Sequence, residues 1–207
     1  MHIAILFYGR INKFKEHYKN IMESLGNSNT FDIFYSCDNA PLELLQEFIQ
    51  LYKPVSVINE KIEFTTNFGD YPKHPNTNIN NMIAHFLNKL RVFSLLETHV
   101  EIHKIHYDLI ISLRLDVLFE DNMQFYTIEE GTIYIPEGYD FEQFAINDQI
   151  AYGSITTMKK YMNIIHNIDF ILNNRQTILH PESLTYINIL NNGLKIIRFP
   201  FKYILDK

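Results

Sequence analysis

A charged pair, Arg114 and Asp116, stands directly after an apolar run, residues 109–113, within the segment YDLIISLRLDVLF at positions 107–119. A run that is apolar on both faces is typical of a strand in the middle of a parallel sheet covered by helices. Such sheets bind their ligands at the carboxyl ends of the strands. The pair therefore predicts a site for an anionic ligand, and a structural ion pair at the strand end is the alternative.

Other carboxylates and cations accompany this pair: Asp38, Asp148, Glu182 and Arg10 near strand ends or a helix start, and Lys89 and Arg91 on the preceding helix. A carboxylate can hold a divalent cation that neutralises a diphosphate, and an arginine can clamp the same phosphates through two hydrogen bonds. A separate carboxylate can accept the proton of an incoming hydroxyl. These groups are the ones needed for displacement at a sugar carbon with a nucleoside diphosphate as the leaving group.

Two of these cations have a plainer interpretation. Lys89 and Arg91 lie off the apolar stripe of the predicted helix 79–101, so a solvated helix face is the default expectation for both. Histidines 99, 103 and 106 cluster near the end of the same helix, where exposed side chains are favoured over a zinc site. The sequence contains no phosphate-binding P-loop, dinucleotide fingerprint or nucleophile elbow.

The composition bounds the class of protein. The 207 residues are enough for one core, so a single domain, 1–207, is expected. The net charge of −6 disfavours general nucleic-acid binding. Cys37 is the sole cysteine, which fits a reducing compartment and predicts a cytoplasmic protein. The N-terminus reads as a strand rather than a signal peptide, and no apolar run is long enough for a membrane span.

Hydrophobic periodicity predicts an α/β fold in which strands and helices alternate, with right-handed crossovers and a mostly parallel central sheet. The expected strands are residues 2–8, 31–37, 53–59, 107–113, 132–136, 150–154 and 194–199. The expected helices are residues 12–25, 79–101 and 156–168, a helix that starts at Pro41, and another from Pro181 to Gly193.

The segment 60–78 breaks this pattern, because it is polar and lacks a clear period. It is longer than most loops of a compact domain. We expect it to lie beside a ligand cleft and to become more ordered when ligand binds.

Several segments together resemble the GT-A glycosyltransferases, in particular small capsular-polysaccharide-type enzymes and those of large DNA viruses. They are YDLIISLRLD, IYIPEG, NDQIAYGS and HPESLTYINIL, and the resemblance is strongest over residues 79–190. It implies a GT-A-like, Rossmann-like single domain. It also implies a hexosyl- or deoxyhexosyltransferase that moves a sugar from a nucleotide-sugar, with UDP favoured, to a saccharide acceptor. The alternative is a catalytically silent nucleotide-sugar-binding or assembly module. A nucleotidyltransferase would need a glycine-rich basic loop after the first strand, and FYGRINK matches such a loop poorly.

The resemblance also implies roles for individual residues on the donor side. Asp116 matches the second aspartate of the Asp-x-Asp motif, which holds Mn²⁺ or Mg²⁺, and His180 is the candidate for a C-terminal metal ligand. Arg114 occupies the first aspartate position and, because it cannot ligate a cation, would meet phosphate or ribose itself. Further donor contacts are implied for Lys89 or Arg91 on the preceding helix and for Gly9, Arg10 and Asp38 at the strand ends.

On the acceptor side, Asp148 in NDQ matches the acidic residue near the acceptor and is the expected general base. Glu182 is the reserve candidate for this role. Its alternative is a favourable interaction with the dipole of the helix that starts at Pro181.

Overall fold

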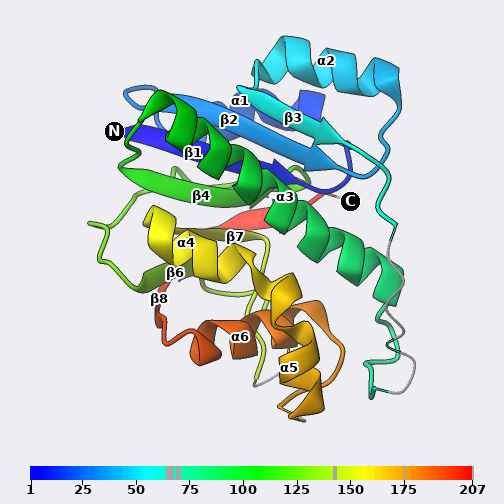
Figure 1. Cartoon of the computed structure of the whole chain (residues 1–207). Helices are drawn as coiled ribbons and strands as arrows, with labels where there is room; N and C mark the ends of the chain where they lie inside the picture. The colour runs from blue at the N-terminus through cyan, green and yellow to red at the C-terminus, as the bar shows by residue number, and fades with distance from the viewer. Residues whose placement is uncertain (64–67, 69–70, 142–143, 175, 207) are drawn as a thin grey trace.

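The fold was analysed in a computed structural model, which describes residues 1–63, 68, 71–141, 144–174 and 176–206. A seven-stranded sheet in the order β3-β2-β1-β4-β7-β6-β8 forms its centre (Figure 1). Its strands are β1 (His2–Tyr8), β2 (Thr30–Cys37), β3 (Ser56–Asn59), β4 (Leu109–Arg114), β6 (Thr132–Pro136), β7 (Ile150–Gly153) and β8 (Lys195–Phe199). The predicted α/β class with a mostly parallel central sheet is confirmed.

One part of the strand prediction needs correction, because β4 does not lie between two parallel neighbours. It pairs parallel to β1 on one side and antiparallel to β7 on the other. Strand β6 is antiparallel to β7 and parallel to β8. The apolar run of β4 reports burial on both faces, which the helices provide whatever the direction of the neighbouring strand.

Helices cover both faces of the sheet (Figure 1). Helices α1 (Phe14–Ser24) and α2 (Leu42–Tyr52) pack on the face that carries Phe7, Tyr35 and Ile111. Helices α3 (Ile79–His103) and α4 (Ile155–Met162) pack on the face that carries Leu6, Phe34 and Ile110, where α6 (Pro181–Asn191) also contributes Ile189. Alternate residues of each strand thus enter separate cores, as the two-residue period of a strand requires.

The 25-residue helix α3 begins at the end of the polar loop and runs across the sheet. Its first turn is capped by the side chain of Asn78, which accepts a hydrogen bond from Asn81 N. At about 1.5 Å per residue the helix is roughly 37 Å long, and it crosses both β1 and β2. Among the described residues, no helix combines the length and the apolar character that crossing a bilayer requires.

The predicted helix 156–168 is wrong in its extent. The chain forms α4, a 3-10 turn at Ile164–His166, and α5 (Ile168–Asn173). Asn163 and Asn167 stand at the two breaks, and the Asn167 amide donates to Asn188 on α6. Asparagine side chains often bond outside the helix and favour its ends.

The sequence patterns also missed two short strands, β5 (Val117–Phe119) and β9 (Tyr203–Leu205), which pair antiparallel with each other. This pairing holds the C-terminal segment against the turn that follows β4. Asp206 N donates a hydrogen bond of 2.9 Å to the main-chain oxygen of Asp116. The carboxyl end of β4 is therefore enclosed by residues from the far end of the chain.

Candidate functional site

The sheet has a topological switch point between β1 and β4. The crossover from β1 to β2 runs through α1 on one face, whereas the crossover from β3 to β4 runs through α3 on the other. In register, Tyr8 at the end of β1 lies opposite Arg114 at the end of β4. Ligands of open α/β sheets bind at such points, so this edge is the expected position of a ligand site.

Arg114 and Asp116 form a two-point pair at this edge. Arg114 Nε donates to Asp116 Oδ1 over 2.9 Å, and Arg114 Nη2 donates to Asp116 Oδ2. Asp116 is buried, whereas 27% of the Arg114 side chain remains exposed. Burial tends to lower the pKa of Arg114, but the bond to Asp116 and its charge raise it above the ordinary value. The guanidinium is a permanent cation whose exposed part can meet an anion.

A second polar group lies between this sheet edge and α3, centred on Asp148. Oδ2 of Asp148 is 2.8 Å from His85 Nε2 and 3.9 Å from Lys89 Nζ. Its main-chain oxygen accepts hydrogen bonds from Tyr8 Oη at 2.8 Å and from Lys89 Nζ at 3.3 Å. The same lysine bonds Tyr161 Oη at 3.3 Å. We call His85, Lys89 and Asp148 the buried triad.

The solvated face predicted for Lys89 is wrong. Only 1% of the residue is exposed, and its ammonium lies 5.3 Å from the ring centre of Tyr8 and 4.8 Å from that of Tyr161. Off the apolar stripe, the helix faces a buried carboxylate instead of solvent. Arg91 behaves differently, because its Nη1 donates to the main-chain oxygen of Glu60 over 2.9 Å. It is not part of the triad.

Protonation in the triad follows from burial and charge. Burial alone would raise the pKa of Asp148, but the contact with His85 and the positive charges of Lys89 and Arg114 reverse this and hold the pKa well below its usual range. Burial lowers the pKa of His85 below 6.5, and lowers the pKa of Lys89 to about 8 against the attraction of Asp148. At pH 7 the imidazole is therefore neutral, and Lys89 is the cation that balances Asp148.

Glu182 is joined to this group through Gln149. Gln149 Nε2 lies 3.3 Å from Asp148 Oδ1 and 3.4 Å from Glu182 Oε1, and Gln149 Oε1 accepts a bond of 3.0 Å from Tyr203 Oη. Burial, together with the charge of Asp148, raises the pKa of Glu182 to about 7. The two carboxylates thus sit in one network with pKa values shifted in opposite directions, a pattern that separates acid–base roles.

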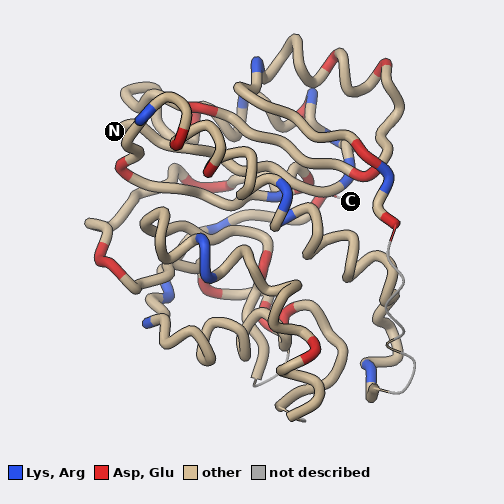
Figure 2. Tube along the Cα trace, in the orientation of Figure 1, with Lys and Arg blue, Asp and Glu red and all other residues tan. Residues whose placement is uncertain are grey.

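The other predicted donor contacts lie at neighbouring strand ends. Gly9 follows β1 with φ of +98°, a conformation that favours glycine, and the Arg10 side chain is exposed. Asp38 follows β2, where its Oδ1 accepts a hydrogen bond of 2.8 Å from Ile62 N. Figure 2 shows acidic and basic positions close together beyond the carboxyl ends of β2 and β3.

The described residues offer no ready cage for a divalent cation: no three His, Cys, Asp or Glu side chains among them come together for metal binding. Both carboxylate oxygens of Asp116 already accept from Arg114. His180 stands at the start of α6, with its ring stacked on Phe141 at 3.9 Å. The rings of His99 and His103 lie 4.4 Å apart at the end of α3. These residues do not fit a resident cation held by protein alone.

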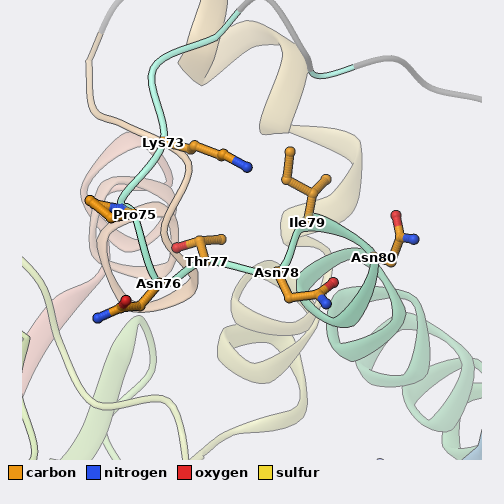
Figure 3. Close-up of a pocket in the computed structure, with 7 residues that line it drawn as sticks. All are labelled: Lys73, Pro75, Asn76, Thr77, Asn78, Ile79 and Asn80. Atoms are coloured by element: carbon orange, nitrogen blue, oxygen red, sulfur yellow. The ribbon is translucent and has the colours of Figure 1, made fainter.

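A shallow pocket of about 420 Å³ lies at the N-terminus of α3, away from the triad (Figure 3). It is lined by residues 73 and 75–80, and Lys89 is ten positions further along the helix, roughly 15 Å. This pocket uses part of the loop 60–78. Residues 64–67 and 69–70 of that loop lie outside the described residues, so its predicted ordering stays a prediction.

Sequence reasoning missed His85, Tyr8, Tyr161 and Gln149. A signal for His85 existed, because it precedes Lys89 by four residues and therefore shares its helix face. Tyr8 ends the first strand, at the edge where ligands were expected. Tyr161 shares the buried face of α4 with Met158 and Met162, and this apolar pattern gives no reason to place it beside a lysine.

Comparisons with known proteins add no family, since no family model matches the chain and no curated protein matches its sequence.

Proposed function

We propose that the protein is a glycosyltransferase of the GT-A type, which transfers a hexose or deoxyhexose from a nucleotide-sugar, UDP-linked by preference, to a saccharide acceptor. The observation that carries the proposal is the arrangement at one sheet edge. The permanent cation Arg114 and two carboxylates with opposite pKa shifts, Asp148 and Glu182, gather there. Separate groups for a departing diphosphate and for an acceptor proton are what this transfer requires.

On the donor side, we assign Arg114 to the diphosphate. A partly exposed guanidinium held by Asp116 is pre-oriented, and arginine binds phosphate through two parallel hydrogen bonds. Gly9, Arg10 and Asp38 would surround the nucleoside at the ends of β1 and β2. A Mn²⁺ or Mg²⁺ ion bound to the diphosphate would be the other route to charge neutralisation, and Asp116 would contact it only after an oxygen is released from Arg114.

On the acceptor side, the geometry favours Glu182 over Asp148 as the general base of an inverting transfer. An efficient base has a pKa near the working pH, which Glu182 meets at about 7. Asp148 has a much lower pKa, and it is almost completely buried beside His85 and Lys89, with 4% of its side chain exposed. We assign Asp148 to holding Gln149 and setting the charge near Glu182.

The second candidate function is a catalytically silent module that binds nucleotide-sugars. The observation that favours it is Arg114 itself, because it stands where the resembled family has a first aspartate and occupies both oxygens of the second. Such a module would bind donor through the same strand ends without turning it over.

Release of nucleoside diphosphate from a panel of UDP-hexoses and GDP- and dTDP-deoxyhexoses tests the proposal, measured with EDTA and with Mn²⁺. We expect slow donor hydrolysis that an acceptor accelerates and that Glu182→Gln abolishes while donor still binds. If at least one donor binds but no donor is turned over, the protein is the silent module. Failure of every donor to bind would refute both functions.

We also propose that this reaction takes place in the cytoplasm. The sole cysteine, Cys37, is a buried free thiol, as suits a reducing compartment.

A further inference from the structure

A groove of about 650 Å³ lies outside the donor site, where β8 ends and the segment after β5 crosses the sheet. Its lining includes four aromatic side chains with polar groups beside them: Asp121, Gln124, Phe125, Tyr126, Phe199 and Phe201. This volume is within the range of small-molecule sites, and aromatic and polar side chains share the wall of the groove about equally. Neither the buried triad nor the Arg114–Asp116 pair uses these residues.

The aromatic wall is packed from behind and partly open. Tyr126 is 50% exposed, although its ring stacks near Tyr134, with centroids 5.9 Å apart and planes within 11°. Its main chain is also fixed, because Tyr126 N donates to Tyr152 Oη over 3.1 Å. The chain has no tryptophan, so tyrosine and phenylalanine rings are its largest flat apolar surfaces. An exposed ring held in place from behind is a platform for stacking.

The polar groups of the groove are acceptors and amides. Asp121 is exposed and is fixed by a hydrogen bond of 3.1 Å from Lys202 N to its Oδ2. Asn122 and Gln124 supply exposed side-chain amides that both donate and accept. Among the described residues that line the groove there is no lysine or arginine. The lining therefore suits a neutral ligand rich in hydroxyl groups and disfavours an anionic one.

We propose that this groove binds a neutral saccharide chain. A pyranose ring has an apolar face of C–H bonds and a rim of hydroxyls. The face would stack on Tyr126, and the rim would bond to Asp121 and Gln124. Given the function proposed above, the chain is the distal part of the acceptor, and the protein extends or decorates an oligosaccharide rather than a single sugar.

The position of the groove supports this assignment. Phe199 ends β8 opposite Pro136 of β6, and both strands run in the direction of β4, so the groove opens at the same sheet edge as the donor site. Ring contacts lead from Phe199 to Phe201 at 6.2 Å and from Phe201 to Tyr203 at 6.1 Å. Tyr203 then bonds Gln149, which contacts Glu182. One continuous set of side chains thus joins the groove to the proposed base.

Binding can be tested without any donor, so this test is independent of transferase activity. Cellohexaose, maltohexaose and chitohexaose are titrated into the ¹⁵N- and aromatic-¹³C-labelled protein, and chemical shifts are followed by NMR. We expect at least one hexasaccharide to shift the signals of Tyr126, Gln124 and Phe201 at millimolar concentration. No shift in the groove with all three would overturn the proposal.

Variants locate the contact. Tyr126→Ala should lower the affinity for the hexasaccharide at least tenfold, and Gln124→Ala should lower it several-fold. Tyr126→Phe should retain this affinity. Phe170→Ala is the matched control, since Phe170 is a 60% exposed ring on α5. Equal affinities for Tyr126→Ala and Phe170→Ala would refute the site. So would concentration-dependent dimerisation that Tyr126→Ala abolishes, because a second copy of the chain would then be the occupant.

Kinetics connect the groove to the acceptor. In Tyr126→Ala the acceptor KM should rise at least tenfold for a hexasaccharide and stay unchanged for a monosaccharide, with the donor KM unaffected. If the groove binds saccharide but the protein shows no turnover, saccharide binding at the groove stands and the proposed transfer is refuted. An active transferase whose KM ignores acceptor length would refute the acceptor role alone.

Discussion

His85 Nε2 lies 2.8 Å from Asp148 Oδ2, yet neither atom has a partner in regular hydrogen-bond geometry among the described residues. The two groups touch as a close polar pair rather than along the N–H direction. Since Lys89 Nζ is 3.9 Å from the same oxygen, this carboxylate is balanced mainly by charge. That makes Lys89 the residue on which the buried triad depends.

Lys89→Met should be strongly destabilising, because it leaves Asp148 charged, buried and without its cation. Breaking a buried ion pair by removing one partner costs about 3–5 kcal/mol, which urea unfolding would measure. The control is Lys159→Met, since Lys159 forms an exposed pair with Glu97 and should cost at most about 1 kcal/mol.

A second substitution at the partner checks the cause of this loss. Adding Asp148→Asn to Lys89→Met removes the unpaired charge and should recover part of the lost stability. If Lys89→Met is no worse than Lys159→Met, the triad does not hold the charges assigned to it.

Glu182 should set the acid limb of the rate profile. A general base must be deprotonated, and with a pKa of about 7 Glu182 would lose activity progressively as the pH falls below 7. Asp148 raises this pKa through its negative charge, so Asp148→Asn should move the limb to lower pH by about one unit. An unchanged limb in Asp148→Asn, or an active Glu182→Gln, would contradict the assignment.

The same pKa shift makes a prediction for stability. The folded-state pKa of about 7 exceeds the ordinary value of 4.5, so the folded protein binds more protons between these values. The stabilising contribution of Glu182 is therefore complete below about pH 4.5 and lost as the pH rises through 7. Glu182→Gln, which cannot ionise, should gain on the order of 1–2 kcal/mol over wild type between pH 5 and pH 8.

Glu43→Gln is the matched control for this measurement. Glu43 lies in the first turn of α2 and Glu182 in the first turn of α6, so both variants lose the same interaction with a helix dipole. Glu43 is exposed, whereas Glu182 is half-buried. A similar pH dependence in the two variants would mean that the helix dipole, and not burial near Asp148, governs Glu182.

The strands of the parallel half were predictable because β1, β2 and β4 are apolar along most of their length, and local periodicity reports burial directly. The pairing of β5 with β9 was not, since each has three residues and the partners lie more than eighty positions apart. Strand direction beyond β4 was equally hidden, because burial on both faces gives the same pattern in either orientation.

In the candidate site, too, features set by the local sequence were predictable and features set by tertiary contacts were not. Arg114 and Asp116 were found because only Leu115 separates them in the sequence and because Arg114 ends a strand. The burial of Lys89 depends on Asp148, 59 residues away, so its helix alone pointed to solvent. The shifted pKa of Glu182 likewise depends on a charge from another element. Chemical type and position were readable from the sequence, whereas the environment of each charge required tertiary contacts.

Donor affinity should depend on Asp116. Asp116→Asn loosens the pre-oriented Arg114, and donor Kd should rise at least about tenfold, or about 1.4 kcal/mol. Calorimetric titration of the wild-type protein with donor, in EDTA and in Mn²⁺, separates phosphate binding by Arg114 from phosphate binding through a cation. Binding in EDTA favours Arg114 as the phosphate contact, whereas binding only with Mn²⁺ favours a cation on Asp116.

The control for Asp116→Asn must remove another hydrogen-bonded carboxylate, far from the carboxyl edge. Asp32 serves, because its Oδ2 pairs with His2 at 3.0 Å and accepts from Tyr107 at 2.6 Å near the amino ends of the strands. Asp32→Asn should lower the melting temperature without changing donor Kd. If Asp116→Asn behaves in the same way, losing stability with normal donor affinity, then Arg114 and Asp116 are a structural ion pair. The donor site must in that case be sought elsewhere on the sheet edge.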